Sequence, residues 1–63
     1  MINNKIRKLR LQKSLSMKEL AEKANISVSY LSLLEKEKRK NPSKEIMKKI
    51  SKALEEDIME IFF

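Results

Sequence analysis

The stretch LSMKELAEKANISVSYLSLL, which occupies residues 15–34, decides the fold. Ser16 is followed three residues later by Glu19, a pattern typical of a capping box at the start of a helix. Apolar residues at helical spacing continue as far as Asn25. After glycine, asparagine is the residue that best tolerates the left-handed conformation that ends many helices. The pattern therefore predicts a short helix over about residues 16–24.

A second helix is expected immediately after that turn. Ser27 can cap it, and Leu31 and Leu34 would form its buried stripe, which places this helix over about residues 27–36. Two short helices joined by so few residues make a helix-turn-helix.

The rest of the chain has the same helical pattern on both sides of this motif. Apolar residues recur every three or four positions up to about Lys13 and again from Ile46 onward, and no segment alternates as a strand does. Residues suited to capping precede these runs: Asn3 or Asn4, Ser43, and Asp57 with Glu60 as a further capping box. The sequence thus predicts an all-α fold, a compact bundle of five short helices in a single helix-turn-helix domain over residues 1–63.

The composition excludes most enzyme chemistry. The 63 residues include no glycine, cysteine or histidine. A phosphate-binding glycine loop, a disulfide framework, a zinc site and a Ser-His-Asp arrangement are therefore ruled out. We expect no enzymatic activity, no cofactor and no metal. Four acids near the end could suggest a metal site, but helix capping explains them better: Glu55, Glu56, Asp57 and Glu60.

The net charge of +6 is unevenly distributed along the chain. Residues 1–54 carry all 15 lysines and arginines and a net charge of +10, whereas residues 55–63 carry a net charge of −4. This separation favours a polyanion as the partner of one face, although charge alone would also fit a solvated surface. No stretch approaches the length of a membrane span or resembles a signal peptide, so we expect a cytoplasmic protein with no membrane partner.

The motif resembles the DNA-binding domains of phage repressors and Cro, known as the XRE or lambda-repressor-like family. The segments that carry the similarity are residues 6–10, 15–27, 29–35, 41–43, 50–54 and 61–62. The pattern is most similar to that of the Sin-type sporulation and biofilm repressors of Gram-positive bacteria. The resemblance implies a bacterial, phage or mobile-element transcription regulator, most often a repressor. Such a regulator binds double-stranded DNA at palindromic operators as a homodimer.

The resemblance makes the helix over residues 27–36 the recognition helix and places its amino-terminal part in the major groove. The base contacts that it implies are Val28, Ser29, Ser32 and Leu33. Val28 and Leu33 can make only apolar contacts, for which thymine methyl groups are the available partners, and serines discriminate weakly between bases. We therefore expect A·T-rich half-sites, with DNA shape carrying much of the specificity. The alternatives are that Leu33 belongs to the core and that Val28 packs over the turn.

Phosphate contacts should come from helix starts and nearby cations. The residues favoured for them are Ser16, Lys18, Tyr30, Lys38, Lys40, Asn41 and Lys44. For Tyr30 the alternative is a packed ring, and for the lysines it is a solvated charged surface. Met17 stands where many relatives carry a phosphate-binding glutamine, and it is expected to be a buried apolar residue.

Arg10 and Glu35 occupy positions at which relatives hold an ion pair between the first helix and the recognition helix. We expect such a pair to orient the recognition helix rather than to contact bases. At the carboxyl end, Phe62 is expected to complete the core. Met59 and Phe63 are the candidates for a dimer or protein-partner surface, with a frayed chain end as the alternative.

The absence of glycine leads to a prediction about the backbone. The family usually has glycine at three helix ends, which correspond here to Ser14, Asn25 and Glu37. Asparagine tolerates the left-handed conformation well and serine less well, whereas a glutamate would be strained there. We therefore expect the chain to depart from the family pattern at Glu37.

Other functions remain compatible with the sequence. The same domain serves in antitoxins of toxin–antitoxin pairs, which usually add a toxin-binding segment, and in the controllers of restriction–modification systems. A hypothesis from another class is a cationic helical protein that binds RNA or anionic membranes through charge alone. That protein would show no sequence preference and would not need the helix-turn-helix spacing.

Overall fold

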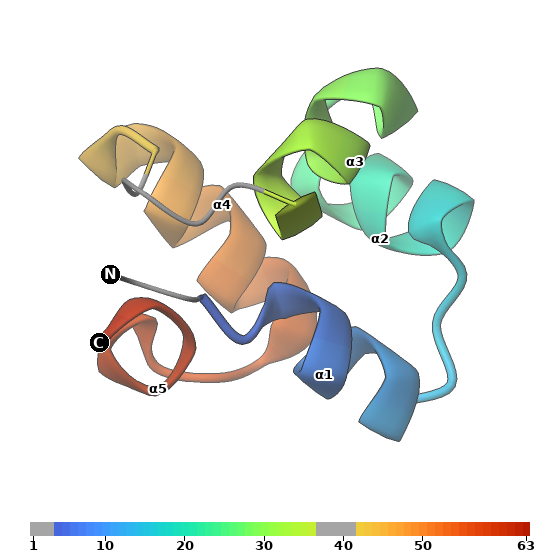
Figure 1. Cartoon of the computed structure of the whole chain (residues 1–63). Helices are drawn as coiled ribbons and strands as arrows, with labels where there is room; N and C mark the ends of the chain where they lie inside the picture. The colour runs from blue at the N-terminus through green and yellow to red at the C-terminus, as the bar shows by residue number, and fades with distance from the viewer. Residues whose placement is uncertain (1–3, 37–41) are drawn as a thin grey trace.

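Five helices form in the part of the chain that this computed structural model describes, residues 4–36 and 42–63 (Figure 1). They are α1 (Ile6–Gln12), α2 (Met17–Ala24), α3 (Val28–Lys36), α4 (Lys44–Leu54) and α5 (Ile58–Phe62). No strand occurs within these two segments. The predicted all-α fold is therefore confirmed. Likewise, no helix of these segments is long and apolar enough to cross a membrane.

The two motif helices begin at the predicted caps. The Ser16 hydroxyl oxygen accepts a hydrogen bond from the Glu19 backbone N–H at 3.0 Å, and the Glu19 carboxylate accepts one from the Ser16 N–H at 2.8 Å. The Ser27 hydroxyl oxygen accepts from the Tyr30 N–H at 3.0 Å. These bonds satisfy N–H groups that have no partner inside the helix, and they fix where α2 and α3 start.

The core lies where one face of each helix meets the others, with α2 packed against both α3 and α4. Among the described residues, the buried apolar side chains are Ile6, Leu20, Ala21, Ala24, Leu31, Leu34, Met47, Ile50, Leu54, Ile61 and Phe62. Burying one large side chain such as Leu31 contributes about 1.5–3 kcal/mol. Met17, which was expected to be buried, is only half-buried and packs at the edge of the core.

The predicted capping box at α5 is wrong. Asp57 occupies the N-cap position with extended backbone, but its side chain makes no capping hydrogen bond. The residue is exposed, so its carboxylate is open to hydration. The start of α5 is held instead by the Asp57 carbonyl, which accepts from the Glu60 N–H at 3.0 Å. Glu56 forms an ion pair with Lys13 at 3.3 Å, so the acidic residues near the chain end have different roles.

Among the described residues, three adopt the left-handed conformation, and none of them is glycine: Ser14 (φ 58°), Asn25 (φ 59°) and Glu55 (φ 58°). The first two were predicted. Glu37 lies outside the described residues. Glu55 was not predicted; it ends α4, and its backbone turns the chain back towards α5.

Replacing Glu55 by glycine should stabilise the protein. The left-handed conformation costs an L-residue about 1–2 kcal/mol, and the greater freedom of glycine in the unfolded chain offsets about 0.4–1 kcal/mol of the gain. We expect a net increase of about 0.5–1 kcal/mol in the free energy of unfolding, measured by urea denaturation. Lys48→Gly, at an exposed position inside α4, is the matched control and should destabilise by about 1 kcal/mol. Equal destabilisation by both changes would contradict the strain at Glu55.

Candidate nucleic-acid interface

One face of α3 is exposed while the opposite face is buried. Leu31 and Leu34 are buried, whereas the Leu33 side chain is 62% exposed. Leu33 is therefore not a core residue, and Val28 and Ser29 are also exposed. Ser32, one turn after Val28, is half-buried. The four residues predicted to contact bases thus share the outward side of one helix.

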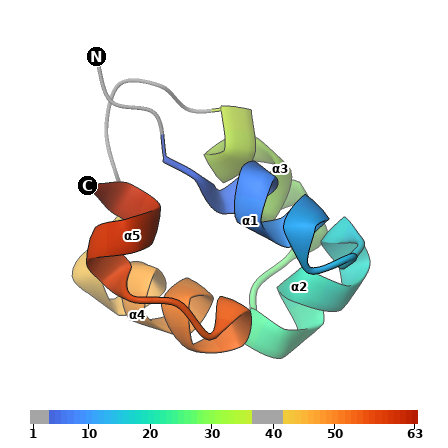
Figure 2. The same cartoon turned by 90° about the horizontal axis from the view of Figure 1, so that it is seen from below.

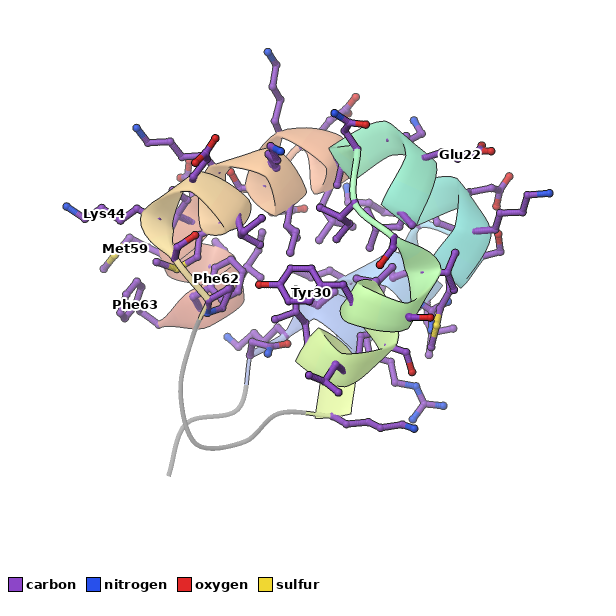
Figure 3. All side chains as sticks on the ribbon, turned by 90° about the horizontal axis from the view of Figure 1, so that it is seen from above. Glu22, Tyr30, Lys44, Met59, Phe62 and Phe63 are labelled. Atoms are coloured by element: carbon purple, nitrogen blue, oxygen red, sulfur yellow. The ribbon has the colours of Figure 1, made fainter. Side chains whose placement is uncertain are left out.

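The residues predicted to contact phosphate lie at helix starts and along α3. Ser16 and Lys18 are exposed at the amino end of α2, and Lys44 is exposed as the first residue of α4. Figure 3 shows the Tyr30 ring extending from α3 in the direction of α4, with Lys44 pointing outward at the edge of the molecule. The remaining three residues predicted for this role, Lys38, Lys40 and Asn41, lie outside the described residues.

A hollow between α1, the start of α2 and α3 adjoins this face. Its lining residues are Arg7, Arg10, Met17, Ser32, Glu35 and Lys36. Neither Arg7 nor Lys36 was favoured as a site residue from the sequence. A sequence feature that could have identified Arg7 is its position three residues before Arg10, which puts both cations on one helix face. The signal for Lys36 was its position one turn after Ser32.

Arg10 and Glu35 join α1 to α3 through a bidentate ion pair. The Arg10 Nε donates to Glu35 Oε2 at 2.7 Å and Nη2 donates to Oε1 at 3.2 Å. Arg10 Nη1 also donates to the Leu15 carbonyl at 2.9 Å, which ties the pair to the segment before α2. The two side chains are only 9% and 3% exposed, so both charges are removed from water and depend on each other.

The start of α2 also carries a titratable group. Hydrogen bonds from the Ser16 backbone N–H and from its side chain hold the pKa of the Glu19 carboxyl below its ordinary value, with a smaller contribution from Lys23. The pKa of Glu19 is lower in the folded protein than in the unfolded chain. At pH values above the ordinary glutamate pKa, the capping box therefore contributes its full stabilisation to α2. The stabilisation is lost as the pH falls through the lowered value.

The apolar side chains near the end of α5 divide into a buried set and an exposed set. Ile61 and Phe62 are buried, as predicted for Phe62, whereas Met59 and Phe63 are 68% and 69% exposed. Figure 3 shows Met59, Phe63 and Lys44 at the same edge of the molecule. Within residues 4–36 and 42–63, no three carboxylates gather into a possible metal site.

Two short helices joined at a left-handed asparagine, with the second helix exposing one face, define a helix-turn-helix protein. The family model described as Helix-turn-helix matches residues 6–61, and the chain belongs to this family.

Proteins similar to this chain include transcriptional regulators of Bacillus. The chain is 42% identical over 55 residues to the HTH-type transcriptional regulator SinR of Bacillus subtilis strain 168, covering 87% of this chain and 50% of SinR. It is 40% identical over 62 residues to SlrR of the same organism, covering 98% of this chain and 41% of SlrR. The chain thus spans half or less of the length of these curated relatives.

A solved structure extends the similarity to three dimensions. The crystal structure of SinR, the master regulator for biofilm formation, in complex with DNA superposes with a TM-score of 0.80 at 38% identity. The match covers 87% of each chain.

Proposed function

We propose that this protein is a transcription regulator of a class that most often acts by repression. It binds specific double-stranded DNA sequences. The observation that carries this proposal is the exposed face of α3, whose Ser32 shares a hollow with the cations Arg7 of α1 and Lys36 of α3. The family and the SinR–DNA structure support it. The matched region acts as one DNA-binding domain, and it works in the cytoplasm, where bacterial DNA lies. The family and its relatives are regulators rather than enzymes.

Base recognition is assigned to the outward side of α3. Val28, Ser29, Ser32 and Leu33 face the floor of the major groove when the helix enters it by its amino-terminal half. The apolar side chains Val28 and Leu33 contact thymine methyl groups, and the two serines add hydrogen bonds of low selectivity. Such a surface selects A·T-rich half-sites and depends on DNA shape for the rest of its specificity.

Phosphate contacts are assigned to the rim of this face. The residues are Ser16, Lys18, Tyr30 and Lys44, with Arg7 and Lys36 added from the hollow beside Ser32. Ser16 is the exposed N-cap of α2, and a helix start favours an anion such as a phosphate group. Lys38, Lys40 and Asn41 remain assigned to this role from the sequence pattern alone.

The protein binds its operator as a homodimer in this proposal, because one domain reads only a half-site. Met59 and Phe63 are large, exposed and located at one edge, so they are assigned to the contact with the second copy or with another protein partner.

A double change, Met59→Ser with Phe63→Ser, tests this assignment. The wild-type protein should protect two half-sites about 10 bp apart, centre to centre, and sediment on that DNA as a dimer. The double variant should bind as single copies and more weakly. Leu11→Ser removes another exposed apolar side chain, from α1, and should change neither result. Dimeric binding by the double variant would contradict the assigned surface.

A further inference from the structure

One side chain, that of Asn4, joins the ends of two helices. Its Nδ2 donates a hydrogen bond to the Leu34 carbonyl at 2.9 Å, and its Oδ1 accepts one from the Ile6 backbone N–H at 3.1 Å. Leu34 is in the last turn of α3 and Ile6 is the first residue of α1. Both backbone groups belong to the set that has no partner within its own helix. Asn4 therefore satisfies one backbone group of α1 and one of α3 at the same time.

This double contact requires a side-chain amide. A carboxamide carries a donor and an acceptor on one rigid group, whereas a carboxylate only accepts and an alanine does neither. An aspartate at this position would keep the bond to the Ile6 N–H, lose the bond to the Leu34 carbonyl and place a negative charge against that carbonyl oxygen. The substitution Asn4→Asp therefore releases α3 while it keeps the hydrogen bond to the start of α1.

The contact lies next to the other attachment of α3. Asn4 bonds Leu34, and Arg10 bonds the adjacent Glu35. The segment before α1 and α1 itself therefore attach to the last turn of α3 at two consecutive residues. The Lys5 N–H in turn donates to the Ile61 carbonyl at 2.7 Å, which fixes the start of α1 to α5. Figure 2 shows the start of α1 lying between the end of α3 and α5.

We propose that Asn4 is a positioning residue, which fixes the direction in which α3 presents its outward face to DNA. This inference rests on the DNA binding proposed above and names a determinant of its specificity. α3 has nine residues, so it is about 13 Å long at about 1.5 Å per residue and tilts as one body. Recognition groups must be held within about 0.5 Å of their working positions. Releasing one end of α3 therefore misplaces Ser29 and Leu33 without removing any group that touches DNA.

The test compares the wild type with Asn4→Asp and Asn4→Ala. The measured quantity is the specificity ratio, the affinity for a selected operator divided by the affinity for scrambled DNA, at a temperature where circular dichroism shows each protein to be folded. We expect both variants to lower the ratio by about threefold to tenfold, the range that one hydrogen bond supplies. Gln12→Glu, at the far end of α1, adds the same charge as Asn4→Asp does and is the matched control; it should weaken both affinities alike and leave the ratio unchanged.

The outcomes separate the inference from the proposed function. An unchanged ratio in folded Asn4→Asp and Asn4→Ala, with a wild-type ratio far above one, would overturn only the positioning role. A wild-type ratio near one would overturn the proposed function and the inference with it. If Asn4→Asp unfolds at the assay temperature, the neutral Asn4→Ala decides the result alone, because thermal destabilisation of a still-folded protein does not change a ratio of two affinities.

Discussion

Replacing Glu35 by alanine is expected to destabilise the protein by about 3–5 kcal/mol, because it breaks a buried ion pair and leaves one charge without its partner. The substitution leaves the Arg10 guanidinium, only 7% exposed as a residue, without its carboxylate. A chain of 63 residues has a total stability of roughly 3–9 kcal/mol at about 0.05–0.15 kcal/mol per residue. The variant should therefore be largely unfolded or close to it, as measured by urea denaturation followed by circular dichroism.

Two control variants test whether the loss of stability comes from the burial of the ion pair. Glu56→Ala breaks the ion pair with Lys13, whose side chains are 30% and 33% exposed, and should cost less than about 1 kcal/mol. The double change Arg10→Met with Glu35→Leu removes both buried charges and should recover most of the stability. If Glu35→Ala and Glu56→Ala had the same urea midpoint, the buried pair would not orient α3 as described.

Operator binding is expected to weaken steeply with salt. Each phosphate neutralised by a lysine or arginine releases counterions and contributes about −0.9 to the slope of log affinity against log salt. A dimer that places six cations on phosphates should therefore lose about 10³-fold in affinity between about 50 and 200 mM salt. Fluorescence anisotropy titrations of a labelled operator at four salt concentrations measure this slope.

Two substitutions test the phosphate contacts and the base contacts separately. Lys44→Gln should lower the salt slope by about one for each phosphate that it leaves without a cation, and it should weaken binding to all sequences alike. Ser29→Ala should leave the slope unchanged and alter the preferred bases. The same behaviour from both variants would show that the assignment of phosphate and base contacts is wrong.

The parts of the fold that depend on neighbouring residues could be predicted from the sequence. The Ser16–Glu19 box and the left-handed Asn25 are decided within three or four residues, and both are present. The box expected at Asp57 and Glu60 has the same spacing, but the exposed Asp57 carboxylate makes no capping bond. A local pattern therefore indicates where a helix starts more securely than it indicates which atoms hold that start.

The parts of the site that depend on tertiary packing could not be predicted in the same way. Periodicity alone allowed Leu33 to be either core or surface, and only the packing of α3 shows it exposed. Asn3 or Asn4 was expected to cap the first helix, but Lys5 holds the N-cap position of α1. The bond from Asn4 to Leu34 spans 30 positions, and no spacing rule reaches that far. The hollow that adds Arg7 and Lys36 also exists only once α1 and α3 are packed together.

Selection of bound sites from a random DNA library tests the central claim most directly. The protein should enrich a palindromic site with two A·T-rich half-sites about 10 bp apart. Enrichment should fail when Ser29 and Leu33 are both replaced by alanine in a folded protein. Equal affinity for the selected pool and for random DNA would contradict sequence-specific recognition and leave only charge-driven binding.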